Sequence, residues 1–130
     1  MKEIEKIMIN PVNLKIIDRL AIISVNNAPV NALGLSVRIG LMSALDKVEN
    51  DKDVLCVAII GEKNTFPAGA DIKEFGRPPQ PPHLPQICDR IENLNKPVIS
   101  AMHGTPLGGG CEIALSSHYR IAVENVKIGL

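Results

Sequence analysis

The 130-residue sequence predicts an α/β fold, and two observations carry this prediction. Short β-branched apolar runs alternate with segments whose apolar residues recur at helical spacing, which is typical of strands and helices packed in layers. One run, residues 54–60 (VLCVAII), is continuously apolar and ends at Gly61, as expected for a strand buried on both faces of a parallel sheet. With 45% apolar residues, the chain is long enough to form one soluble unit with a real core.

The first part of the chain predicts a strand pair followed by a helix. Residues 13–18 and 20–26 are apolar and β-branched, and the turn formers at 26–29 end the second run. From Ser36 to Val48 the apolar residues fall on one helix face, and Ser36 is the expected N-cap. The buried strand at 54–60 comes next.

The second part predicts a stiff loop, two helices and further strands. Five of the nine residues from 77 to 85 are proline, which favours an exposed loop and excludes a helix or a central strand. Helical spacing resumes at Ile87, Ile91 and Leu94. The remaining expected elements are a strand at 97–102, a helix at 111–117, and strand-like pieces at 119–123 and 126–128.

Composition argues against several classes of function. Fourteen basic and fourteen acidic residues give no net charge, and the chain has two Phe, one Tyr and no Trp, so we expect no nucleic-acid partner. Three cysteines without a C-x-x-C motif predict neither a metal site nor a disulfide framework. No stretch approaches the ~18 apolar residues of a membrane span, so we expect a cytoplasmic protein, or one of an organelle matrix in a eukaryote.

Two loops consist of residues with minimal side chains where a ligand would approach the backbone closely. Residues 68–71 (AGAD) follow the strand at 54–60, and residues 108–112 (GGGCE) follow the strand at 97–102. Ligands of α/β proteins bind at the carboxyl ends of strands. If both loops lead into helices, each presents unpaired N–H groups, and two such groups aimed at one oxygen form an oxyanion hole.

The residues alone leave other interpretations open. A glycine triplet is more often a flexible turn, and this one fits neither a dinucleotide-binding nor a P-loop motif. Glu112 lies in the expected first helical turn, where a carboxylate either offsets the helix dipole or acts in catalysis. Asp71 is expected as an N-cap rather than a catalytic acid, and Lys73 and Arg77 are either solvated charges or contacts for phosphate.

Four co-ordered motifs give the sequence a close resemblance to a known family. They are residues 28–33 (APVNAL), 66–75 (FPAGADIKEF), 96–101 (KPVISA) and, after Gly104, 108–114 (GGGCEIA). In letters, order and spacing they are similar to the crotonase (enoyl-CoA hydratase/isomerase) superfamily. Residues 118–122 and 128–130 further resemble the hydratase portion of bifunctional enoyl-CoA hydratase/3-hydroxyacyl-CoA dehydrogenases.

The resemblance implies a crotonase-like spiral of ββα units, assembled into homo-oligomers such as trimers or hexamers. It implies that the backbone N–H groups of Ala70 and Gly109 form the oxyanion hole and that Glu112 is one of two catalytic glutamates. The substrate is an acyl-CoA thioester, with no further cofactor and no metal. The residues expected to contact the substrate and its coenzyme A are Ala68, Gly69, Ala70, Asp71, Ile72, Lys73, Gly108 and Gly109.

Three functions are weighed on this basis. The first is hydration of 2-trans-enoyl-CoA to 3-hydroxyacyl-CoA in fatty-acid β-oxidation. The second, an alternative to it, is isomerisation of Δ3- to Δ2-enoyl-CoA. In the hydratases that the chain resembles, the second glutamate comes in a Pro-Glu pair directly after the Gly-Leu pair that here is residues 129–130. We therefore expect residues 1–130 to be the N-terminal portion of a single crotonase-like domain, with the proline-rich loop 77–85 inside it. The third function is an inactive CoA-binding or assembly fragment.

Overall fold

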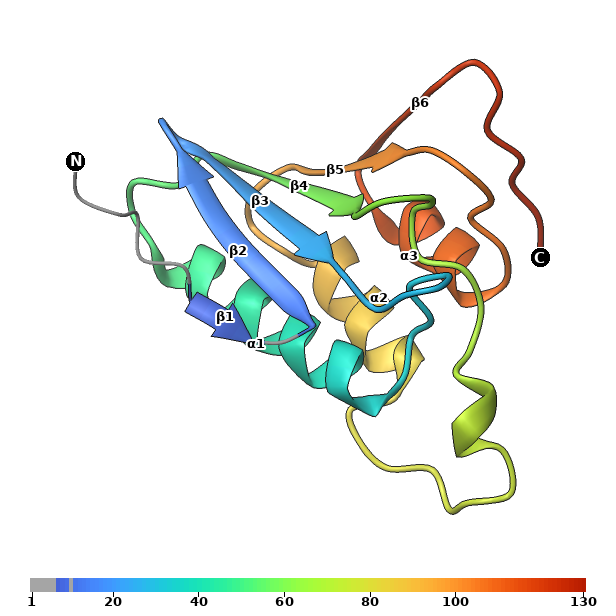
Figure 1. The fold of residues 1–130 in the computed structure, drawn as a ribbon. Helices are drawn as coiled ribbons and strands as arrows, with labels where there is room; N and C mark the ends of the chain where they lie inside the picture. The colour runs from blue at the N-terminus through green and yellow to red at the C-terminus, as the bar shows by residue number, and fades with distance from the viewer. Residues whose placement is uncertain (1–6, 10) are drawn as a thin grey trace.

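The fold is built on one mixed sheet. A computed structural model describes residues 7–9 and 11–130, and their six strands are ordered β1-β2-β3-β4-β5-β6 (Figure 1). β1 to β3 are antiparallel neighbours, whereas β3 to β6 run parallel. The strands are β1 (Ile7–Ile9), β2 (Val12–Ile17), β3 (Leu20–Val25), β4 (Cys56–Gly61), β5 (Val98–Met102) and β6 (Tyr119–Ala122).

The helices lie together below the sheet as it is drawn in Figure 1. They are α1 (Leu35–Asn50), α2 (Leu84–Glu92) and α3 (Gly109–Ser116), and a short 3₁₀ helix, η1 (Ile72–Glu74), lies between β4 and α2. Each parallel step of the sheet therefore includes a helix, as parallel connections require. The predicted α/β class and the predicted strand pair are confirmed; the pair is antiparallel, and the expected parallel arrangement begins at β3.

The register of the strands places the buried side chains of the core on one face of the sheet. Ile23 pairs with Ile59, which pairs with Ser100, and all three are buried. α1 packs against β2 and β3 through side chains that recur at helical spacing, among them Val37, Leu41, Leu45 and Val48. Ile87 and Ile91 of α2 and Ile113 of α3 complete this core, together with Phe66.

The expectation that residues 54–60 are buried on both faces is wrong. Along β4 burial alternates, so that Val57 and Ile59 are buried, whereas Cys56, Ala58 and Ile60 are only partly covered. The helices cover one face, and the described part of the chain leaves the other face partly open. A continuous apolar run thus predicts the strand correctly, but it does not predict whether one or both faces of that strand are buried.

Several predicted boundaries also need correction. α1 begins at Leu35 with Gly34 as its N-cap, so Ser36 is not the cap. Pro85 lies in the first turn of α2, because proline needs no helical hydrogen-bond partner there. α3 begins at Gly109, two residues before the expected start. Residues 126–128 form no strand; an isolated bridge joins Leu107 to Gly129 instead.

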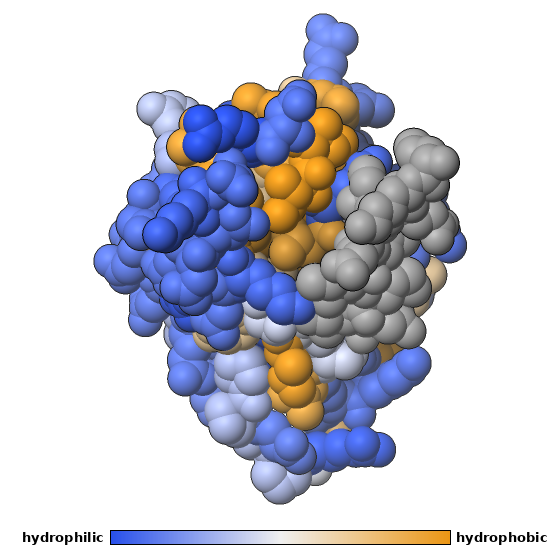
Figure 2. All heavy atoms as spheres, turned by 90° about the vertical axis from the view of Figure 1, so that its left-hand side faces the viewer, coloured by the Kyte–Doolittle hydropathy of each residue, from blue (hydrophilic) through white to orange (hydrophobic). Residues whose placement is uncertain are grey.

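Apolar side chains also reach the surface. Figure 2, which views the molecule from the left of Figure 1, shows a band of them flanked by polar residues. Exposed apolar residues of the whole molecule include Ile17, Leu55, Tyr119 and Ile121. Within residues 7–9 and 11–130 no helix is long and apolar enough to cross a bilayer.

Lys96 closes the C-terminal end of α1, so its replacement is expected to lower stability. Its ammonium donates to the carbonyls of Val48 and Asp51, both at 2.5 Å. Since hydrogen bonds from a charged donor contribute about 1.5–3 kcal/mol, Lys96→Met is expected to lower the free energy of unfolding by about 2 kcal/mol in urea titrations. Lys52→Met, at an exposed position near the same helix end, is the control, and equal effects of the two variants would contradict this role.

Candidate functional site

The two small-residue turns follow β4 and β5 and meet at one carbonyl. The Leu107 oxygen accepts hydrogen bonds from the N–H groups of Gly69, at 2.8 Å, and Gly110, at 3.0 Å. Gly69 belongs to the turn after β4, and Gly110 to the first turn of α3, which follows β5. The structure therefore brings together two segments about 40 residues apart, as the sequence predicts for the carboxyl ends of parallel strands.

Close backbone contact explains why glycine stands at these positions. A Cβ on Gly110 would lie 1.6 Å from the carbonyl oxygen of Pro67, where no atom fits. Gly69 and Gly108 have φ angles of 77° and 53°, which side-chain-bearing residues rarely adopt. The glycines therefore allow one turn to rest directly on the other.

The N–H groups of Ala70 and Gly109, like those of Asp71 and Cys111, have no acceptor among the described residues. Their neighbours Gly69, Gly108 and Gly110 all donate to carbonyls, whereas no hydrogen bond within residues 7–9 and 11–130 uses the N–H of Ala70 or Gly109. Both residues line the same pocket. Two free main-chain donors thus lie in adjacent turns at one cavity.

In the peptide group of each donor, the carbonyl oxygen accepts a hydrogen bond from another backbone N–H. The Gly69 oxygen accepts from the Leu33 N–H at 3.0 Å, and the Gly108 oxygen accepts from the Glu112 N–H at 3.0 Å. Both peptide bonds are trans, so each N–H points away from its tethered carbonyl. The orientation of both donors is therefore fixed before any ligand binds.

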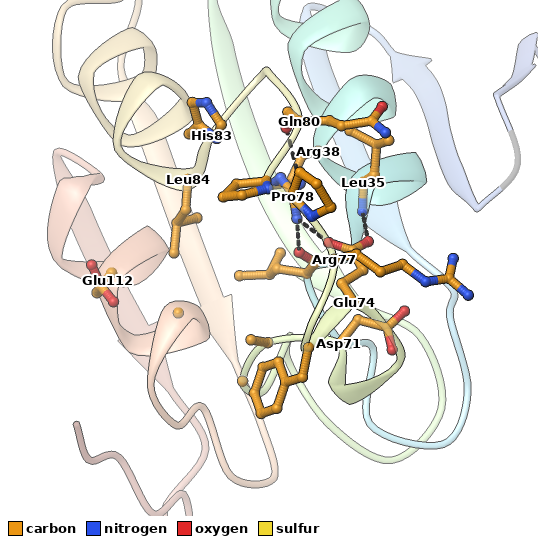
Figure 3. Close-up of a pocket in the computed structure, with 16 residues that line it drawn as sticks. Leu35, Arg38, Asp71, Glu74, Arg77, Pro78, Gln80, His83, Leu84 and Glu112 are labelled. Atoms are coloured by element: carbon orange, nitrogen blue, oxygen red, sulfur yellow. Dashed lines mark hydrogen bonds and ion pairs between the residues drawn. The ribbon is translucent and has the colours of Figure 1, made fainter.

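The pocket has a volume of about 460 Å³ and holds five of the predicted site residues (Figure 3). These are Gly69, Ala70, Asp71, Gly109 and Glu112. Ala68, Ile72, Lys73 and Gly108 are not among the lining residues, and the side chains of Ile72 and Lys73 are exposed. The remaining walls come from Leu33, Leu35, Arg38, Glu74, Phe75, Arg77, Pro78, Pro79, Gln80, His83 and Leu84.

Glu112 is the pocket carboxylate without a partner. It lies in the first turn of α3, across the pocket from Glu74 and Arg38 in Figure 3, and is exposed. Asp71 accepts from the Lys73 N–H at 3.0 Å as the N-cap of η1, which confirms its expected role. Glu74 is paired with Arg38 at 3.1 Å, whereas no hydrogen bond of the described residues involves the Glu112 carboxylate.

Cys88 packs beside Glu112 without offering a nucleophile. Burial raises the pKa of its thiol, and the charges of Glu112, Asp89 and Glu92 raise it further against the lowering effect of a hydrogen bond with Ser116. The thiol is therefore protonated at neutral pH, and thiols in this form are poor nucleophiles. Among the described residues, no group of three His, Cys, Asp or Glu side chains could hold a metal ion.

Asn31, to which the sequence assigned no role, supports the site by holding the loop that leads into it. This buried residue has a φ of 57°, which asparagine tolerates better than most. Its amide donates to the carbonyls of Glu62 and Thr65, at 2.9 and 2.7 Å, and so holds the loop that leads to Ala70. The backbone N–H of Ala68 also donates to the Val30 carbonyl, at 3.1 Å, so residues 28–33 act as a support for the first turn.

Comparisons with known proteins agree with the geometry. A family model described as enoyl-CoA hydratase/isomerase matches residues 16–130. A peroxisomal bifunctional enzyme of Danio rerio is 43% identical over 111 residues, which cover 85% of this chain and 16% of that protein. A probable enoyl-CoA hydratase of Bacillus subtilis (strain 168) is 41% identical over 128 residues, covering 93% of this chain and 50% of that protein.

Solved structures confirm the expected fold. The crystal structure of an enoyl-CoA hydratase from Bacillus anthracis has a TM-score of 0.85 at 26% identity, and the match covers 92% of this chain and 50% of that one. A family member from Xanthobacter autotrophicus Py2 gives a TM-score of 0.85 at 29% identity, with 92% and 48% covered. The chain therefore spans about half the length, or less, of the relatives that it matches.

Gly110 is expected to tolerate no side chain, because the Pro67 carbonyl fills the space of its Cβ. Overpacking costs about 1–3 kcal/mol and more where backbone must move, so Gly110→Ala is expected to lower the free energy of unfolding by about 3 kcal/mol or more in urea titrations. Gly129→Ala is the control, since its Cβ would meet only a flexible Leu107 side-chain atom at 3.4 Å. A Gly110→Ala protein as stable as the control would show that the two turns do not need this contact.

Proposed function

The chain belongs to the enoyl-CoA hydratase/isomerase family, and on this premise we propose that it binds a 2-trans-enoyl-CoA thioester and contributes to its hydration to 3-hydroxyacyl-CoA. This is a lyase reaction of fatty-acid β-oxidation, and it needs no resident cofactor. The observation that carries the proposal is the pair of free, tethered N–H groups of Ala70 and Gly109 at one pocket.

The donors suit the charge that develops in this reaction. When water attacks C3 of the enoyl group, the electron pair of the C2=C3 bond moves toward the thioester, and negative charge collects on the carbonyl oxygen. Ala70 and Gly109 would donate to this oxygen. Because their peptide groups are already fixed, they need no reorganisation as the charge forms.

Glu112 supplies a base beside these donors. Its carboxylate is exposed to the pocket and has no ion-pair or hydrogen-bond partner among the described residues, so it is free to orient a water molecule. It would take one proton of that water as the oxygen bonds to C3. C2 then takes up a proton from an acid, a role that the resemblance assigns to a second glutamate.

A Δ3-Δ2 isomerase is the second candidate. Among the described residues of the pocket, Asp71 and Glu74 are engaged in hydrogen bonds, whereas the carboxylate of Glu112 is free to move protons. Isomerisation transfers a proton from C2 to C4 of a 3-enoyl-CoA and needs only one acid/base group. Assays with 2-enoyl-CoA and with 3-enoyl-CoA separate the two reactions.

Coenzyme A binding and assembly extend the proposal. Ala68, Ile72, Lys73 and Gly108 are adjacent in sequence to residues that line the pocket, and the exposed Lys73 is available to phosphate. A homo-oligomer, and a place in the cytoplasm or an organelle matrix, stay predictions. Relatives named as peroxisomal and glyoxysomal proteins support the latter.

Replacing Glu112 is expected to affect turnover rather than binding. Glu112→Gln keeps the size of the side chain and removes the base, so kcat for hydration of crotonyl-CoA should fall by about 10²–10⁴, with KM little changed. The measurement is steady-state kinetics on the full-length protein, with Glu92→Gln on the exposed end of α2 as the control. An unchanged kcat with a small loss of stability would instead assign Glu112 to the helix dipole.

The Gly109 donor is tested by two substitutions that both add a Cβ at this position, although proline also adds a Cγ and a Cδ. Gly109→Pro removes the N–H, whereas Gly109→Ala keeps it, and both place a Cβ near the flexible side chains of Leu33 and Leu84. Loss of one such donor lowers kcat by about 10²–10³, so the proline variant should be slower than the alanine variant by that factor. Equal rates for two folded variants, checked by circular dichroism, would rule out the donor role.

A further inference from the structure

The proline-rich wall of the pocket cannot hold itself in place. Residues 78–82 have the sequence PPQPP, so Gln80 carries the only backbone N–H of the segment. Such a segment cannot join a sheet or close an ordinary turn through its own donors. Its carbonyls are the groups by which it can be anchored, and they need a donor from elsewhere.

Arg38 of α1 is that donor. Its guanidinium donates from Nε to the Pro82 carbonyl at 2.8 Å and from Nη2 to the Gln80 carbonyl at 3.3 Å. The side chain is 11% exposed and lies behind the wall in Figure 3. Because guanidinium is planar and always charged, it can serve several acceptors in one fixed geometry.

The same side chain reaches the turn that carries the Ala70 donor by two routes. Nη1 donates to the Leu33 carbonyl at 2.8 Å, and the N–H of Leu33 holds the Gly69 carbonyl at 3.0 Å. Nη1 also pairs at 3.1 Å with Glu74, at the end of η1. The other carboxylate oxygen of Glu74 accepts from the Leu35 N–H and so caps α1.

We propose that Arg38 is a positioning residue that fixes the proline-rich wall relative to the Gly69–Ala70 turn and so sets the width of the substrate pocket. Four acceptors from three separate segments converge on one guanidinium, and no lysine ammonium could serve all of them at these distances. The consequence for turnover rests on the function proposed above, whereas the anchoring of the wall does not.

Three variants of the full-length protein test this inference. Arg38→Met removes the charge and the donors, Arg38→Lys keeps the charge beside Glu74, and Arg90→Met is the matched control. Arg90 also joins α1 to α2 through two carboxylates, those of Asp46 and Glu49, but it lies outside the pocket lining. Hydrogen exchange of residues 72–84 without substrate reports the anchoring, and kinetics with C4 and C10 enoyl-CoA report its effect on the pocket.

Both Arg38 variants are expected to exchange faster across residues 72–84, on the order of tenfold, while Arg90→Met exchanges there like the wild type. They should lose about 10- to 100-fold in kcat/KM, with an altered ratio between the C4 and C10 substrates, because small misplacements of a site cost this much. Arg38→Lys remains informative if Arg38→Met does not fold.

Three results would overturn the inference. These are unchanged exchange in Arg38→Lys, a wild-type chain-length ratio in an otherwise active Arg38→Lys, or equal effects of the Arg38 and Arg90 variants. If the wild-type protein turns over neither 2-enoyl- nor 3-enoyl-CoA, the proposed function fails, and the exchange measurement still decides whether Arg38 anchors the wall.

Discussion

The candidate site depends on one close approach, in which the Pro67 carbonyl occupies the space where residue 110 would otherwise carry a Cβ. This contact, together with the Leu107 carbonyl that accepts from Gly69 and Gly110, sets the distance between the two turns. Parallel strands bring the turns to one edge of the sheet, but only glycine lets them touch. The free N–H groups of Ala70 and Gly109 are neighbours because their supporting backbones are in contact.

Much of the fold could be predicted from local pattern. The strand pair, α1, β4 and the helix near the glycine triplet follow from apolar runs and their periodicity, and the parallel sheet follows from the alternation of strand and helix. One boundary that failed, the start of α1, depends on a partner distant in sequence. Ser36 is a good local cap, yet α1 starts earlier because the Glu74 carboxylate, 39 residues further on, accepts from Leu35. No local signal encodes such a contact.

The candidate site was likewise predictable from the sequence only in part. Ala70, Gly109 and Glu112 were identifiable because small residues and an acid follow strands, and the order of the motifs resembles a family. Asn31 and Arg38 were not, since a buried asparagine and a helical arginine look ordinary until their acceptors are known. For Asn31 a signal existed, because it lies in a motif of the resemblance, residues 28–33, to which no function was given. For Arg38 the proline run offered an indirect signal: a segment without donors implies a donor elsewhere.

The two candidate donors are peptide groups, and this affects how such a site can diverge. A main-chain N–H is present whatever side chain a residue carries, and only proline deletes it. Sequence drift can therefore reshape the proline-rich wall and the apolar lining while the two backbone N–H groups persist. A solved relative with only 26% identity keeps this fold at a TM-score of 0.85.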